Sequence, residues 1–136
     1  MKKSKKIKHI SLKSLRRLAW KLESEYVRRS GADRKGYNFC FTCGKKDHWK
    51  NLDCGHYIHR NNLNYDLVNL KPQCTRCNRF LHGNLGVYAE RLIAEYGEEA
   101  IRNLRCRGNE NKKFTIFELK ELIEKYTELL DRKSVV

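Results

Sequence analysis

The chain has 136 residues and a strongly basic composition, with 30 Lys+Arg against 16 Asp+Glu and a formal net charge of +14. This length predicts one compact domain with appended helices. Such a charge surplus bears on partners rather than on fold, and it favours a polyanion, most simply nucleic acid. The surplus is uneven, because residues 1–35 hold 13 basic and 3 acidic side chains.

Membrane and secretory functions are not expected. No apolar run approaches the ~20 residues that a membrane-spanning helix needs, and the basic amino terminus lacks the apolar stretch of a signal peptide. We therefore expect a cytoplasmic protein with no membrane partner and no small-molecule substrate. In that compartment the six cysteines are not expected to form a disulfide framework, and Cys-x2-Cys pairs indicate a metal instead.

The first 35 residues divide into a basic arm and a basic helix. Residues 1–10 predict an arm that is disordered in the free protein and orders on phosphates. Residues 11–35 predict an amphipathic helix with Ser11 as N-cap and a stop at Gly31. The basic face is either solvated or in contact with DNA. The candidate DNA-binding residues of these two segments are Lys5, Lys6, Arg16, Arg17, Arg28 and Arg29.

The middle of the chain, residues 36–84, predicts short β structure followed by a helix. Residues 37–39 lead into the first cysteine pair, and residues 49–58 predict a hairpin. Residues 61–66 predict a loop and residues 67–71 an extended segment. A helix is then expected from Cys74 through Asn78 toward His82, ended by Gly83.

Residues 85–136 predict a helical region. Helices are expected over 86–96 and 98–105, with a polar loop over 106–113. Thr115 and Glu118 have the spacing of a capping box in front of a helix over 116–132. We expect this last helix to be structural or an interface.

Four cysteines have the spacing of a zinc site. Cys40 and Cys43 form one Cys-x2-Cys pair, and Cys74 and Cys77 form the other. Four thiolates suit tetrahedral Zn²⁺ in a structural role, because no coordination position stays open for catalysis. The alternatives are two redox pairs or buried thiols. Cys54 and Cys106 stand outside the pattern and are expected to be small buried or indifferent residues. The Cys54 side chain alternates with that of Asp53 and is expected to face away from the active cleft, which we expect Asp53, His56 and Asn78 to share around a second metal ion.

Between and after the cysteine pairs lie the residue types that hydrolyse phosphodiesters, namely a base, a metal site and an orienting group. His56, Asn69, Asn78 and His82 follow in the order of the HNH, or ββα-metal, nuclease motif, which the segment resembles. The resemblance implies that His56 is the general base and that Asn69 orients it or shapes the loop. It also implies that Asn78 binds a catalytic Mg²⁺ or Mn²⁺. Asn78 and His82, four apart, are expected to share a helical face.

One position departs from that motif. A metal ligand is expected directly before the base, and Gly55 stands there. Asp53 is our candidate replacement ligand. In the alternative, His56 binds the metal and His59 or a water is the base. His82 is a second candidate ligand, or a phosphate contact.

A closer resemblance covers roughly residues 37–97. The segments CGHY and NLKPQCTRCNRFLHGNL, continuing into Tyr88 and the following helix, resemble the NinG/Rap family of lambdoid phage recombination proteins. That family implies a structure-specific endonuclease that cuts branched DNA, including Holliday junctions and D-loops, in the cytoplasm of the bacterial host.

Together these patterns predict an α+β, mostly helical protein with a zinc-stapled ββα-metal core flanked by helices. Arg60, Arg76 and Arg79 are further candidates for phosphate contact. Paired cuts at a junction imply a homodimer, with residues 12–30 or 116–132 as its interface. The rival functions are an HNH nuclease of ordinary duplex DNA, a non-catalytic zinc-ribbon DNA-binding adaptor and a redox protein.

Overall fold

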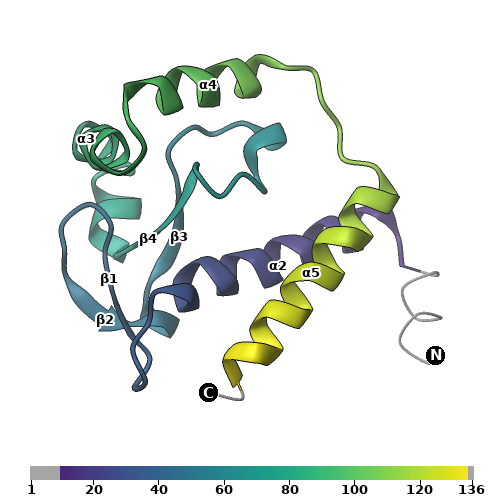
Figure 1. Cartoon of the computed structure of the whole chain (residues 1–136), viewed down its shortest axis with the longest axis horizontal. Coiled ribbons are helices and arrows are strands. Elements are labelled where there is room, and N and C mark those ends of the chain that lie inside the picture. Colours follow the sequence, from purple (N-terminus) through teal and green to yellow (C-terminus); the bar gives the residue numbers. More distant parts are fainter. Residues whose placement is uncertain (1–9, 135–136) are drawn as a thin grey trace. The chain divides into compact units, whose positions relative to one another are not determined.

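The computed structural model describes residues 10–134, which form two compact units. One unit holds the described residues up to Tyr26 together with those from Lys113 onward, and the other is Val27–Lys112. These unit boundaries, after Tyr26 and before Lys113, differ from the segment boundaries expected from the sequence, which fell after residues 10, 35 and 84. The elements in chain order (Figure 1) are α2 (Leu12–Ser30), β1 (Tyr37–Phe39), β2 (Lys46–His48), η1 (Trp49–Asn51), β3 (Asp53–His56), η2 (Asn61–Leu63), β4 (Leu70–Gln73), η3 (Arg76–Phe80), α3 (Leu85–Tyr96), α4 (Glu98–Asn109) and α5 (Ile116–Ser134).

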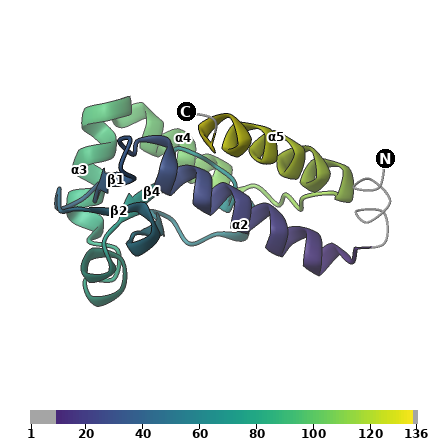
Figure 2. The ribbon, with the colours of Figure 1, turned by 90° about the horizontal axis from the view of Figure 1, so that it is seen from below.

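The first unit is built from α5 and the first four turns of α2, which lie side by side (Figure 2). Both helices begin where the sequence predicts. The Ser11 hydroxyl accepts from the Ser14 N–H at 3.2 Å, and Thr115 and Glu118 exchange the two bonds of a capping box at 3.1 and 3.2 Å. The Tyr126 hydroxyl of α5 donates to the buried Glu23 carboxylate of α2 at 3.2 Å, which links the two helices.

The second unit contains two antiparallel strand pairs. β1 pairs with β2, and β3 pairs with β4 so that Asp53 faces Gln73 and His56 faces Leu70. The predicted hairpin over residues 49–58 is therefore wrong. Its first residues form the 3-10 turn η1, and β3 finds its partner beyond a loop of residues 57–69. Local alternation predicted a strand here but did not identify this distant partner.

The helix after the second cysteine pair is shorter than predicted. η3 is a π-helical segment that ends at Phe80, and His82 follows with a left-handed φ of 51°. The prediction that Asn78 and His82 share a helical face is therefore wrong. The cause is local, because the N–H of Gly83 turns back to the Cys77 carbonyl at 2.9 Å, which closes the segment over the cysteine.

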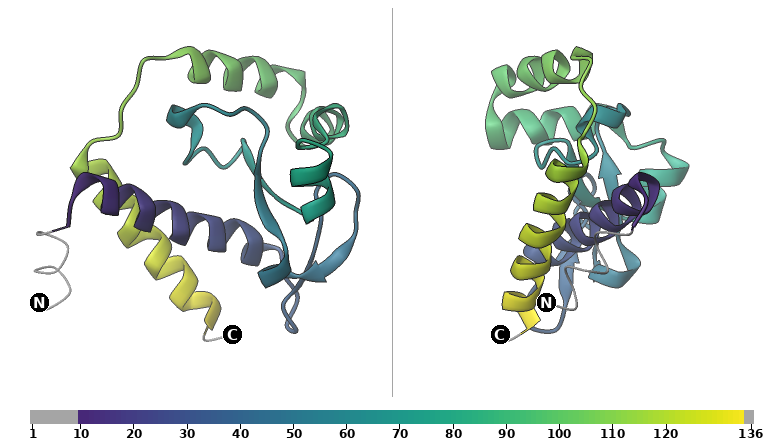
Figure 3. Two further views of the ribbon diagram at one scale, coloured as in Figure 1. Left: turned by 180° about the vertical axis from the view of Figure 1, so that it is seen from behind. Right: turned by 90° about the vertical axis from the view of Figure 1, so that its right-hand side faces the viewer.

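α3 begins and ends close to its prediction, whereas α4 continues to Asn109. Residues 106–109 are thus helical, and the prediction that they belong to a polar loop is wrong. The last turn of α4 packs against η2, where Gly108 is buried and a Cβ placed on it would lie 3.1 Å from Leu63 Cδ1. This packing stabilises helical backbone in a segment whose polar residues alone favour a loop. α4 runs along the loop between β3 and β4 (Figure 3). Among the described helices, none combines the length and apolar character needed to cross a bilayer.

Candidate metal centre and active site

The four predicted zinc ligands form one cluster. The Sγ atoms of Cys40, Cys43, Cys74 and Cys77 all lie within 4.8 Å of one another, and those of Cys43 and Cys74 are 3.7 Å apart. Thiolates at about 2.3 Å around a tetrahedral zinc ion have Sγ atoms about 3.8 Å apart. The donor set and its spacing therefore fit a structural zinc ion, which joins the β1–β2 turn to the start of η3.

Backbone and side-chain donors already point at these sulfurs. The N–H of Cys43 donates to Cys40 Sγ and the N–H of Cys77 donates to Cys74 Sγ, each at 3.5 Å. The Asn84 amide donates to Cys77 Sγ at 3.7 Å, and the Thr42 hydroxyl lies 3.3 Å from Cys40 Sγ. Such donors orient thiolate ligands and stabilise their negative charge.

The electrostatics of the cluster favour a bound cation. Burial raises the pKa of Cys74 to about 12. Burial also opposes ionisation of Cys40, but the Cys43 N–H and the Thr42 hydroxyl bring its pKa down to about 6. Four thiolates this close repel one another, so all four ionise together only around a divalent cation.

A second cluster joins β3 to η3. The Asn78 amide donates to Asp53 Oδ2 at 3.0 Å, and the Arg79 guanidinium contacts both carboxylate oxygens, at 3.2 and 3.4 Å. The Asp53 side chain is 19% exposed, whereas that of Arg79 is 68% exposed. The structure thus brings together two of the predicted catalytic-metal ligands, Asp53 and Asn78.

The glycine that departs from the motif has a steric explanation. A Cβ on Gly55 would lie 1.8 Å from Oε1 of the fully buried Gln73 on β4. The Gln73 amide group is fixed in this position, because its Nε2 donates to the Gly83 carbonyl at 2.8 Å and to Thr42 Oγ1 at 3.2 Å. The space that a side chain at position 55 would need is therefore occupied by the Gln73 side chain of β4, which explains why this position is a glycine and not a metal ligand.

His56 is half-buried at the end of β3, and its ring centroid lies 5.6 Å from that of His59. Burial lowers the pKa of His56 below its usual 6.5, and the charge of His59 lowers it further, while a hydrogen bond with Asn64 acts in the opposite direction. Successive strand side chains alternate, so Asp53 and Gly55 share one face of β3, and Cys54 shares the other face with His56. Asp53 and His56, which were expected to share one cleft, thus lie on opposite faces of β3. Cys54 is turned away from Asp53 but lies on the face of His56, so it does not face away from the whole expected cleft.

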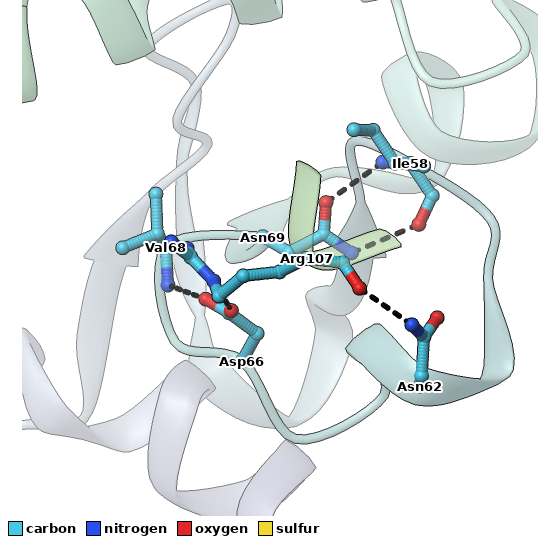
Figure 4. Close-up of polar contacts among 6 residues, drawn as sticks. All are labelled: Ile58, Asn62, Asp66, Val68, Asn69 and Arg107. Atoms are coloured by element: carbon cyan, nitrogen blue, oxygen red, sulfur yellow. Dashed lines mark hydrogen bonds and ion pairs between the residues drawn. The ribbon is translucent and has the colours of Figure 1, made fainter. Parts of the chain in front are cut away.

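Asn69 shapes the loop that follows His56 (Figure 4). Its side chain is fully buried, accepts from the Ile58 N–H at 2.8 Å and donates to the Ile58 carbonyl at 2.9 Å. Asp66, in the same loop, is held by Arg107 of α4 at 2.7 Å. Of the two roles considered for Asn69, these contacts match loop shaping.

Comparisons with known proteins identify the family. The model of the family described as "Bacteriophage Lambda NinG protein" matches residues 1–134. The chain belongs to the NinG family. The proteins named "Protein ninG" of Escherichia phage 933W and of Escherichia phage lambda are each 31% identical to it over 96 residues. That match covers 67% of this chain and 46% and 45% of the two relatives, so the chain spans about half the length of the curated relatives it matches. No solved structure matches the chain.

Most of the other described residues that were predicted from the HNH resemblance and the charge pattern are exposed. His82 lies exposed in a left-handed turn, which removes the helical-spacing argument that placed it beside Asn78. Arg60 and Arg76 are exposed, as are Arg16 and Arg17 on α2. Lys5 and Lys6 lie outside the described residues.

Sequence reasoning missed three other residues, namely Trp49, Gln73 and Phe80. The guanidinium carbons of Arg28 and Arg29 lie 5.3 and 5.2 Å from the Trp49 ring centroid, so Trp49 holds two of the predicted DNA-binding arginines. Gln73 was missed because its role depends on strand register. Phe80 could have been found from the sequence, because a large aromatic residue between Arg79 and Leu81 in a basic segment is a pattern typical of nucleic-acid contacts.

Proposed function

We propose that the protein is a divalent-metal-dependent endonuclease that hydrolyses phosphodiester bonds in branched DNA during phage recombination. The single observation that supports this most is the contact between Asp53 and Asn78. It joins Asp53, on the strand that ends in His56, to Asn78, which directly follows the proposed zinc ligand Cys77 on η3. We also propose that these elements form a ββα-metal core.

Asp53 and Asn78 are suitable ligands for a hard cation. Mg²⁺ and Mn²⁺ prefer carboxylate and carbonyl oxygens, and such an ion would neutralise charge on the scissile phosphate. Asn78 presents its NH₂ group to Asp53, so rotation of this amide about its last torsion would bring its oxygen to the same place. Arg79 meanwhile neutralises Asp53, and its exposed guanidinium is able to move to a phosphate instead.

His56 is the proposed general base. Burial lowers its pKa, so the ring is neutral near pH 7 and able to accept a proton from water. Asn69 fixes the adjoining backbone at Ile58, which limits the positions that His56 can take. The other assignment, in which His59 is the base, makes a different prediction for the two histidine variants.

Branched DNA is proposed as substrate because of the family and the charge. The relatives carry only the name ninG, and the chain spans about half of their length, so the substrate is our inference. Arg60, Arg76 and Arg79 are proposed phosphate contacts, together with the Arg28 and Arg29 pair at Trp49. Two matched cuts in a four-way junction would require two copies of the chain.

Cleavage of a synthetic four-way junction tests this proposal. The full chain, loaded with one zinc ion, is mixed with the junction or with its linear arms in Mg²⁺ or Mn²⁺, and in Ca²⁺ as a non-cleaving control. We expect cuts near the branch in Mg²⁺ or Mn²⁺ and their loss in Asp53→Asn and His56→Ala, with DNA binding kept. Glu90→Gln removes one exposed carboxylate on α3 and is the matched control that should cut normally.

The variants also separate the rival functions. Cutting that is lost in both His56→Ala and His59→Ala would favour the alternative in which His56 binds the metal and His59 is the base, whereas His59→Ala should still cut if His56 is the base. Equal cutting of linear arms and junction would indicate a nuclease of ordinary duplex. Binding without cutting under every metal would leave a zinc-ribbon adaptor, which the Arg79–Asp53 pair favours because it satisfies the carboxylate without a second metal.

A further inference from the structure

An exposed apolar group follows the Asp53–Asn78 contact directly. Phe80 is 75% exposed, and Leu81 and Leu85 are 42% and 43% exposed. Single exposed apolar side chains are ordinary, but three within six residues, beside a proposed active site, form a patch that indicates a partner.

The backbone that carries Phe80 is firmly held. The N–H of Leu81 donates to the Arg76 carbonyl at 2.8 Å, and the N–H of Gly83 donates to the Cys77 carbonyl at 2.9 Å. The turn is thus anchored to a zinc ligand. The backbone of this turn is therefore ordered before any partner binds, so little backbone conformational entropy is lost when Phe80 makes a contact.

The charges around Phe80 indicate the chemistry of the partner. Residues 74–84 include two arginines and a histidine and contain no Asp or Glu. A second copy of this chain, with its formal charge of +14, would bring like charge to this patch. DNA offers both complements, since phosphates suit Arg76 and Arg79, and the faces of bases suit an aromatic ring.

We propose that Phe80, supported by Leu81, stacks on an unstacked base at a DNA branch point and so places the adjoining phosphate at Asp53 and Asn78. This inference rests on the proposed function and names what would select the substrate. In linear duplex the base faces are covered by their neighbours, and opening a step costs several kcal/mol. At a branch point stacking is already interrupted, so the same ring binds there at lower cost.

A base analogue reports this contact without cleavage. Junctions carry 2-aminopurine either at the branch or within one arm, and the zinc-loaded full chain is added in Ca²⁺. We expect a fluorescence change for the branch probe alone. In Phe80→Ala this change should disappear, and the affinity for the junction should fall about 5- to 100-fold relative to linear duplex, the range for one lost base–aromatic stack. Phe80→Tyr should retain both properties.

The matched control is Phe39→Ala, which removes another exposed aromatic ring, 56% exposed, from β1 in the same unit. With its zinc content confirmed, it should behave like wild type. An unchanged branch signal in Phe80→Ala, or an equal loss in zinc-loaded Phe39→Ala, would overturn the inference, as would failure of the wild type to bind junctions. A change in molecular mass of DNA-free Phe80→Ala would assign the patch to a second copy and overturn it as well.

The nuclease proposal fails separately. A wild-type protein that gives the branch signal but cuts no DNA in Mg²⁺ or Mn²⁺ loses the proposed activity and keeps the Phe80 contact. A wild-type protein that cuts junctions while Phe80→Ala binds and cuts them with the same preference keeps the activity and loses this inference.

Discussion

Among single residues, Gly55 links the sequence pattern to the packing most directly. The absent side chain at this position and the buried amide of Gln73 form one steric unit, because Gln73 Oε1 occupies the space in which a Cβ would stand. The same amide bonds to Thr42 beside the cysteine cluster and to Gly83 after η3. A side chain at position 55 would therefore disturb the turns on both sides of the zinc cluster.

We predict that Gly55→Ala lowers the free energy of unfolding by about 1–3 kcal/mol, because Gln73 must leave its two hydrogen bonds to make room. Chemical denaturation of the zinc-loaded protein measures this cost. In a Gln73→Ala background the same substitution should cost much less, since the clashing atoms are gone. An undiminished cost in that background would show that the amide does not cause the strain. Gly86→Ala is the matched control, because a Cβ there meets open space.

His56 gives a pH-dependent prediction. Its folded pKa lies below 6.5, first because of burial and then because of His59, so between the two values the unfolded chain binds more protons. This contribution to stability is fully present above pH 6.5 and is lost as the pH falls through 6.5 toward the lowered pKa. We expect wild type to lose stability over this window more steeply than His56→Gln. Parallel pH profiles from denaturant unfolding would contradict the pKa assignment.

At the scale of elements, the helices with local signals were predictable and the contacts that depend on pairing were not. Ser11 and the Thr115–Glu118 box mark two helix starts within four residues of sequence, and the structure confirms both. The strand that pairs with β3 lies 14 or more residues away in the sequence, and η3 ends where the chain turns back to the carbonyl of Cys77 in the cysteine cluster. The four cysteines were predictable from spacing, whereas the meeting of Asp53 with Asn78 required the fold.

The loop of residues 57–69 is the element that most depends on one buried side chain. We predict that Asn69→Ala lowers the free energy of unfolding by about 1–3 kcal/mol, because the part-buried Ile58 N–H loses its acceptor and the Ile58 carbonyl keeps only the Arg60 N–H. Asn61→Ala, at an exposed position of η2 in the same loop, is the control and should change stability by less than about 0.5 kcal/mol.

The same pair of variants tests what the loop does for the site. If Asn69 positions the backbone beside His56, Asn69→Ala should lose junction cleavage at temperatures where it remains folded. Junction affinity should fall less than cleavage, because Arg60 is the one proposed phosphate contact in this loop, while Arg76 and Arg79 lie on η3. Normal cleavage by a folded Asn69→Ala protein would limit Asn69 to a purely structural role.

For the whole molecule, the two units obtain their stability from different sources. The unit of α2 and α5 buries apolar stripes of two capped helices, with Leu15, Ala19, Leu119, Ile123 and Tyr126 among its buried side chains. In Val27–Lys112 the regular strands are three or four residues long, and the two cysteine pairs close a long segment of chain between them. In such a unit the free energy of metal binding is also free energy of folding.

We therefore predict that zinc removal unfolds Val27–Lys112 while α2 and α5 keep part of their helical signal. The purified chain should bind one zinc ion by elemental analysis. A strong chelator should abolish the amide protection of β3 and β4 in hydrogen exchange before that of α5. Cys77→Ser should reproduce this loss, whereas Cys54→Ser and Cys106→Ser, outside the cluster, should retain the metal. Retained protection of β3 and β4 in the metal-free protein would mean that their packing alone suffices. The Asp53–Asn78 contact would then form without the zinc ion that we hold responsible for joining β4 and η3 to the first cysteine pair.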